Sequence, residues 1–136
     1  MAKMHLEVVT SERVMFSEDV DMIEARGALG EFGILPGHVT FLTTIEPGEV
    51  RIFNDGQTRF LSTGGGFAEV VNDKVTLLLA AAEFPEEIDI TRAYRAKEKA
   101  EEALRDLGFE DRDYRLFELA LYRAIARIGV ASRKGL

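Results

Sequence analysis

The chain of 136 residues contains no cysteine, which excludes a disulfide framework and any thiolate site for a metal or for redox chemistry. Its only histidines are His5 and His38, which lie far apart in the sequence with no acidic pair at metal-ligand spacing. No Ser-His-Asp or Cys-His set can be assembled from the motifs of this sequence. We therefore predict no catalytic residues and no metal site, and a protein that is not an enzyme by itself.

Long apolar runs are also missing, because no run approaches the roughly 18 residues that a membrane span needs. We expect no direct membrane insertion, and no signal peptide in the alternating N-terminal segment MAKMHLEVVT. A net charge of -7 argues against binding to nucleic acid. The charge is uneven, however, because residues 108–136 carry six basic and four acidic residues. The last part of this acidic protein is therefore locally basic.

Residues 1–84 have the pattern of an all-β domain. Alternating or β-branched segments predict strands over residues 4–10, 20–26, 48–54, 58–63, 67–71 and 74–82. Asn54-Asp55-Gly56 and Asn72-Asp73 are typical of hairpin turns. Many short strands with regularly spaced turns predict a β-sandwich or a flattened barrel.

Three consecutive glycines, Gly64 to Gly66, invite comparison with a phosphate-binding loop. They lack the Gly-Lys-Ser/Thr ending of such a loop, and no helical pattern follows them. We therefore expect a tight connection between strands.

Residues 85–136 have the pattern of two helices. Asp89 suits a helix N-cap, Gly108 marks a helix end, and Asp111 or Asp113 suits the next cap. Each helix carries one apolar seam, at positions 93, 96, 100, 103 and 107 and then at Phe117, Ala120, Ala124, Ile128 and Ala131. A short loop makes the helices antiparallel. The predicted fold is α+β in two parts, a β-sandwich domain (1–84) followed by a helical hairpin (85–136).

The seams are rich in alanine, which anchors a helix weakly. Leucine carries about three more carbons than alanine, each worth roughly 0.8 kcal/mol when buried. Each alanine position therefore stabilises the hairpin by about 2 kcal/mol less than leucine would. Two interpretations follow: an ordinary stable hairpin, or one that separates from the β domain at moderate cost.

Gly27 to Val50, which contains GEFGILPGH and PGEV, is rich in glycine and proline with short apolar pieces between them. Composition favours a loop-rich connection between strands, built as a series of tight turns with apolar anchors. The same stretch resembles the signature of the ε subunit of bacterial F-type ATP synthases. The resemblance implies that the segment from Gly27 to His38, with Glu31 at its tip, faces the c-ring, and that Glu31 and His38 contact partner subunits.

The segment IDITRA, which begins at Ile88 and includes Asp89, Arg92 and Ala93, resembles the ATP-binding motif of some bacterial ε subunits. Asp89 can accept hydrogen bonds from an adenine amino group or a ribose hydroxyl, and Arg92 can bind phosphate with two donors. A triphosphate needs more positive charge, which the second helix offers at Arg115, Arg123 and Arg127. Alternatively, Asp89 and Arg92 form a helix cap and an ion pair without a ligand, and the other arginines face an acidic protein partner.

Taken over the whole chain, the resemblance implies a regulatory subunit of the central stalk of a proton-translocating ATP synthase. Its partners would be the γ subunit, the c-ring and the α/β catalytic head, at the cytoplasmic face of the inner membrane, to which it would be peripheral. The hairpin would inhibit ATP hydrolysis, with ATP as a regulatory ligand and no required cofactor. The alternative is a stand-alone β-sandwich module that binds a ligand and carries a helical appendage.

Overall fold

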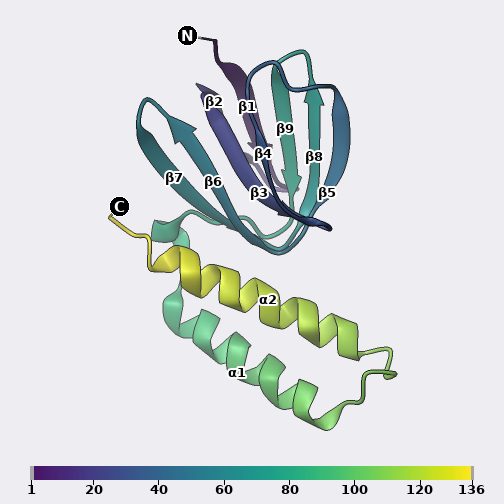
Figure 1. The fold of residues 1–136 in the computed structure, drawn as a ribbon. Coiled ribbons are helices and arrows are strands. Elements are labelled where there is room, and N and C mark those ends of the chain that lie inside the picture. The colour runs from purple at the N-terminus through teal and green to yellow at the C-terminus, as the bar shows by residue number, and fades with distance from the viewer. Residues whose placement is uncertain (1, 136) are drawn as a thin grey trace.

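The computed structural model describes residues 2–135, which form a β-sandwich with two helices packed at one end (Figure 1). The strands within these residues are β1 (Met4–Val9), β2 (Val14–Val20), β3 (Met22–Gly27), β4 (Gly30–Ile34), β5 (Phe41–Ile45), β6 (Gly48–Asn54), β7 (Gln57–Thr63), β8 (Gly66–Val71) and β9 (Lys74–Leu79). A 3-10 turn, η1 (Pro85–Glu87), leads to helices α1 (Ile90–Asp106) and α2 (Tyr114–Ala131). The predicted β-sandwich followed by an antiparallel helical hairpin is confirmed.

The strands form two sheets, ordered β2-β1-β9-β8-β5 and β4-β3-β6-β7. Strands β1 and β9 pair in parallel, whereas the other pairings between strands are antiparallel. Side chains alternate along each strand, so that in β1 Leu6 and Val8 are fully buried while His5 and Glu7 face outward. The core therefore lies between the sheets, and its largest fully buried side chains include Ile23, Ile34, Ile52, Leu61 and Leu77.

Two tight turns hold the predicted hairpins. Asp55 and Gly56 have φ values of 52° and 76°, and Asn72 and Asp73 have φ values of 48° and 59°. Positive φ at both central residues defines the turn that matches the right-handed twist of paired strands. The turn signals read from the sequence are therefore confirmed by the backbone.

The stretch from Gly27 to Val50 was predicted to be a series of tight turns, but it contains the strands β4 and β5. Strand β4 has the sequence GEFGI, in which two glycines hide the strand propensity. Its pairing with β3 supplies the order that the local sequence does not, through Gly27↔Gly30 to Ile23↔Ile34. Strand β2 was likewise absent from the predicted strands, since its exposed residues Ser17 to Asp19 lack strand-like character.

Helix α1 begins as predicted, because Asp89 Oδ1 accepts a hydrogen bond of 3.1 Å from the backbone N–H of Arg92. Ala93 and Ala100 are buried, but Ala96 is exposed, so its place in the predicted seam is wrong. A residue three positions along a helix is rotated by about 300°, which turns Ala96 to the flank of the contact. At the start of α2, Asp113 occupies the N-cap position, and its backbone N–H donates to Asp111 Oδ1 at 2.9 Å.

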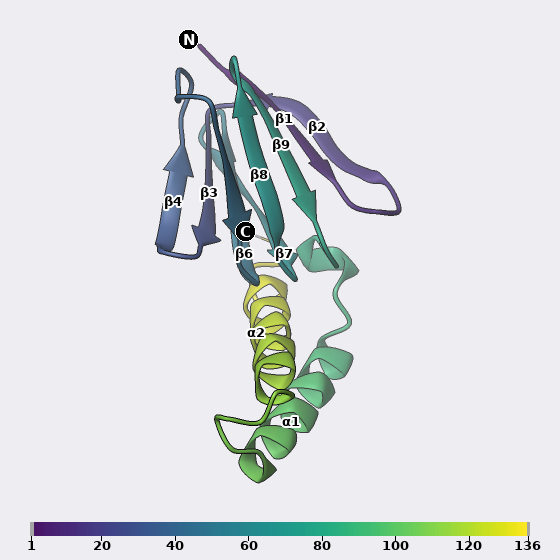
Figure 2. The same cartoon turned by 90° about the vertical axis from the view of Figure 1, so that its right-hand side faces the viewer.

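Helix α2 lies between α1 and the β-sandwich (Figures 1 and 2). It packs against α1 on one side and against β6, β7 and η1 on the other. The buried side chains of α2 within the described residues are small: Ala124, Ala126 and Val130. The buried side chains of this central helix are thus short, and each buries little apolar area.

Candidate functional site

An open cleft of about 460 Å³ lies between β4 and β5, the edge strands of the two sheets. Its lining includes Glu31, His38, Phe41 and Leu42, so the structure brings together the two residues predicted to contact partners. Leu42 is 69% exposed, and Leu29 at the mouth of the cleft is fully exposed. An apolar surface of this kind is typical of a site that binds another protein.

His38 lies in this cleft and is held by contacts within its own turn. The backbone N–H of His38 donates to the Leu35 carbonyl at 3.1 Å across a turn in which Gly37 has φ 83°. The His38 ring lies 4.6 Å from that of Phe41, and its Nδ1 is 2.9 Å from the Val39 carbonyl oxygen. His38 therefore stabilises the turn while one side of its ring remains part of the cleft surface.

Glu31 does not lie at the tip of the β3–β4 hairpin, where the sequence placed it. It lies in β4 opposite Arg26, and the tip consists of Ala28 and Leu29. Sequence reasoning missed Leu29, although a leucine between turn glycines in GALG is the signal that could have identified it. Leu29 is the most exposed large apolar side chain of this edge.

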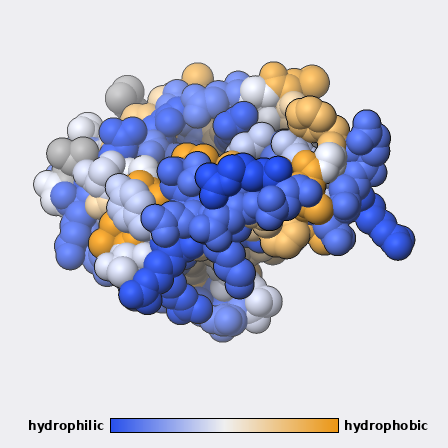
Figure 3. Space-filling view, turned by 90° about the horizontal axis from the view of Figure 1, so that it is seen from below, coloured by the Kyte–Doolittle hydropathy of each residue, from blue (hydrophilic) through white to orange (hydrophobic). Residues whose placement is uncertain are grey.

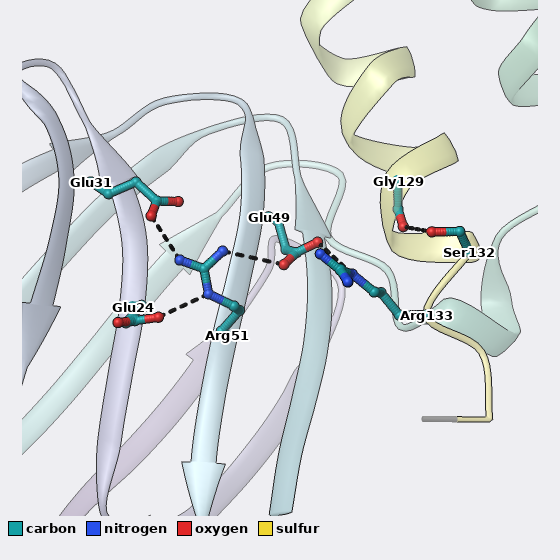
Figure 4. Close-up of polar contacts among 7 residues, drawn as sticks. All are labelled: Glu24, Glu31, Glu49, Arg51, Gly129, Ser132 and Arg133. Atoms are coloured by element: carbon teal, nitrogen blue, oxygen red, sulfur yellow. Dashed lines mark hydrogen bonds and ion pairs between the residues drawn. The ribbon is translucent and has the colours of Figure 1, made fainter.

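A connected set of charges lies on the outer face of the β4-β3-β6-β7 sheet (Figure 4). Arg51 in β6 donates to Glu24 at 2.9 Å, to Glu31 at 2.8 Å and to Glu49 at 3.3 Å. The bond with Glu31, followed by the bond with Glu24, raises the pKa of the Arg51 guanidinium above its ordinary value. Glu49 also accepts from Arg133, just beyond α2, at 3.3 Å.

The residues of the predicted nucleotide site are only partly brought together. Ile88 and Asp89 lie in the connector that enters α1, and Arg92 is exposed in its first turn. Ala93 is fully buried, so its side chain serves packing. Asp89 acts as a helix cap, as the alternative interpretation expected, and this leaves its second carboxylate oxygen for other partners.

The arginines of α2 fall into two groups. Arg127 Nε lies 2.7 Å from Glu83 Oε1, in the connector that leads to α1, and Arg123 packs over Gly64. Arg115 instead bonds Glu118 at 2.6 Å. It lies twelve residues before Arg127, which corresponds to about 18 Å along the helix axis. The closed hairpin therefore places Arg127 near the start of α1 but does not bring Arg115 there.

Seen from the hairpin end, the surface of the molecule is mostly hydrophilic (Figure 3). Within residues 2–135, no helix combines the length and apolar character that crossing a membrane requires. The same residues hold no group of three or more histidine and acidic side chains arranged to bind a metal ion. The prominent features of the described residues are an apolar cleft, a charge network and a helical hairpin that contacts one end of the sandwich.

Comparison with known proteins identifies the family. Residues 3–85 match the model "ATP synthase, Delta/Epsilon chain, beta-sandwich domain", and residues 86–132 match "ATP synthase, Delta/Epsilon chain, long alpha-helix domain". The ATP synthase epsilon chain of Geotalea daltonii is 47% identical over 133 residues, covering 98% of this chain and 96% of the relative. That of Geobacter sulfurreducens is 47% identical over 131 residues, covering 96% and 95%.

Two solved assemblies contain chains of similar fold. One belongs to the OSCP/F1/c-ring part of the Euglena gracilis mitochondrial ATP synthase, with a TM-score of 0.81, 25% identity, and coverage of 97% of this chain and 82% of that one. The other, at 13% identity with a TM-score of 0.58 and coverage of 99% and 98%, comes from the Tetrahymena thermophila enzyme and supports the fold alone. The chain belongs to the delta/epsilon-chain family of ATP synthases. This assignment confirms the prediction that the chain is an epsilon subunit. The epsilon chain is a non-catalytic subunit of the ATP synthase.

Proposed function

We propose that the chain is a regulatory subunit of the central stalk in a proton-translocating F-type ATP synthase. The observation that carries this proposal is the small size of the buried side chains of α2, the helix through which the hairpin contacts β6 and β7. Ion pairs Arg127–Glu83 and Arg133–Glu49 add to that contact, and both stay partly exposed to solvent. Such contacts are weak enough to be exchanged for others.

The released hairpin would extend along the γ subunit into the α/β catalytic head and there inhibit ATP hydrolysis. From Tyr114 onward the chain has five basic residues and one acidic residue, Glu118. This surplus suits acidic surfaces of a catalytic head when the hairpin is extended. The subunit would be peripheral, at the cytoplasmic face of the inner membrane.

ATP is proposed as the regulatory ligand that favours the closed hairpin, and no cofactor is required. Asp89 and Arg92 would bind it, with support from Arg123 and Arg127. Arg127 is already paired with Glu83, so a triphosphate has to replace that carboxylate as its partner. ATP favours the closed state only to the extent that it binds this state more tightly than the extended one.

The cleft between β4 and β5 is proposed as the surface that meets the c-ring and the γ subunit. Its support is the gathering of Leu29, Leu42, Glu31 and His38 on one side of the sandwich. The related Euglena chain belongs to an assembly that includes F1 and a c-ring. A surface patch that combines exposed apolar and polar side chains fits an interface between subunits.

Replacing Glu31 by glutamine and His38 by alanine together should weaken assembly with the stalk by about thirtyfold, because the loss of two central contact residues at about 1 kcal/mol each amounts to about 2 kcal/mol. Neither side chain belongs to the buried core, and both lose only partly exposed contacts, so the free energy of unfolding of the isolated chain should fall by about 1 kcal/mol at most. Binding to the γ–c-ring subcomplex measures the first quantity, and urea unfolding measures the second. The matched control is Glu18→Gln, an exposed glutamate in β2 at the far edge of the other sheet, and equal binding of both variants would refute the proposed surface.

A further inference from the structure

The charge network in Figure 4 connects two parts of the molecule that have separate tasks in the proposed function. Glu31 at one end lines the cleft proposed to meet the c-ring. Arg133 at the other end follows the last turn of α2. Between them, Glu49 and Arg51 make an unbroken series of hydrogen-bonded charges.

The two oxygens of Glu49 are divided between the ends of this network. Oε1 accepts from Arg51 and Oε2 accepts from Arg133, both at 3.3 Å. The Glu49 side chain is only 15% exposed, whereas that of Glu31 is 58% exposed. Glu49 is thus a sheltered carboxylate with two competing cations, and Glu31 is the member that a partner can reach.

Arg133 is positioned for this contact by the end of the helix. The Ser132 hydroxyl donates to the Gly129 carbonyl at 2.5 Å, and the Arg133 backbone N–H donates to the Val130 carbonyl at 2.9 Å. The guanidinium of Arg133 lies 5.0 Å from the centre of the Phe60 ring. These contacts direct Arg133 toward the sheet, so its bond to Glu49 reports whether the end of α2 is docked.

We propose that Glu49 and Arg51 form a relay through which engagement of Glu31 by a cationic group of a partner loosens the end of α2. The relay deepens the regulation described under the proposed function and rests on it. When a partner cation draws Glu31 away, Arg51 loses one of its three carboxylates and binds Glu49 more closely. The charge of Glu49 is then better neutralised by Arg51, which weakens the attraction of Glu49 for Arg133.

The coupling acts in both directions, as linkage requires. When α2 departs, Glu49 loses Arg133 and turns fully to Arg51, which reduces the hold of Arg51 on Glu31. Glu31 is then more available to its partner. Docking at the β4–β5 cleft and release of the hairpin therefore favour one another.

Glu31→Gln removes the charge that holds Arg51 and so imitates the engaged state. Two measurements on the full chain follow α2. Hydrogen exchange of residues 128–132 reports loosening of the last turn, and a spin-label distance between Thr44→Cys and Arg112→Cys reports departure of the hairpin. The chain has no natural cysteine, so both labels are specific. Exchange and the open-to-closed ratio should rise about two- to fivefold, the range for one partly exposed charged contact.

Arg51→Met tests the relay itself, because it keeps an unbranched side chain and removes the guanidinium. In this background Glu31→Gln should change exchange no more than the control Glu18→Gln does. An equal effect of Glu31→Gln with and without Arg51 would overturn the relay, since the charge would then act directly through space. Unchanged exchange and distance in Glu31→Gln alone would overturn it too.

The two proposals fail in different ways. If hydrogen exchange is faster in Glu31→Gln but no variant shows a long distance between the two spin labels, the relay is supported and release of the hairpin is contradicted. If the parent chain already shows long distances between the labels, and Glu31→Gln changes neither these distances nor the exchange, release is supported and the relay is contradicted.

Discussion

Replacing Arg92 by alanine should lower the affinity of the isolated chain for ATP by at least about tenfold. A charge-assisted hydrogen bond contributes about 1.5–3 kcal/mol, and about 1.4 kcal/mol corresponds to a factor of ten. The Arg92 side chain is exposed in the first turn of α1, so its removal leaves the core unchanged. Calorimetric titration with ATP measures the loss, and urea unfolding checks that the fold is kept.

Two further arginines serve as controls for this prediction. Arg105 lies in the last turn of α1, and Arg115 lies at the same end of the hairpin as Arg105. Both should be replaceable by alanine with little change in ATP affinity, although the sequence alone grouped Arg115 with the nucleotide site. If Arg92→Ala binds ATP as the parent does, or if the parent binds none at millimolar ATP, then IDITRA is only a helix cap.

The bias that ATP must supply is small. Typical coupling free energies between a ligand and a conformational change are about 1–3 kcal/mol. The contacts that hold α2 closed are of the same order, because they consist of small apolar side chains and partly exposed ion pairs. In the proposed function, a ligand that binds the closed state about 1–3 kcal/mol more tightly than the extended state is therefore sufficient to shift the hairpin.

Replacing Gly66 by alanine should destabilise the β-sandwich by about 3 kcal/mol or more. A Cβ at Gly66 would lie 1.9 Å from the Leu78 carbonyl oxygen, and the φ of 153° is one that other residues rarely adopt. Forced repacking and backbone strain each cost about 1–3 kcal/mol. The shift appears as a lower urea midpoint at an unchanged slope.

Gly56→Ala is the matched control for this substitution. Gly56 also has a positive φ, 76°, but a Cβ there meets no atom within 4 Å. Only the cost of the left-handed conformation remains, about 1 kcal/mol. Equal losses of stability at Gly56 and Gly66 would mean that close strand contact is not the reason for the glycine at position 66.

Features encoded by neighbouring residues could be predicted from the sequence. The Asp55-Gly56 turn needs two positive φ values, and the residues that tolerate them stand in order along the chain. The cap at Asp89 and the tight connection at Gly64 to Gly66 follow from equally local chemistry. The family signature extended this local reasoning to the whole subunit.

Features that depend on pairing across the fold could not be predicted. Strand β4 forms because β3 pairs with it. Glu31 of β4 reaches Arg51 of β6 because both strands pair with β3, one on each side. The exposure of Ala96 depends on which side of α1 faces α2. Arg115 and Arg127 looked equivalent by charge, and only the length of α2 separates them.

In the proposed function, the hairpin inhibits ATP hydrolysis only after it leaves the sandwich. Glu46 and Arg115 line one crevice of about 250 Å³ between the sandwich and α2, away from Arg92 and Arg127. Cysteines at these two positions, bridged by a short bifunctional methanethiosulfonate reagent, would lock the hairpin closed in the assembled ATP synthase. The measurement is the rate of ATP hydrolysis at low ATP before bridging, after bridging and after reduction. We predict that bridging raises the rate and that reduction restores the lower one, whereas a rate that stays constant or falls on bridging would contradict the account.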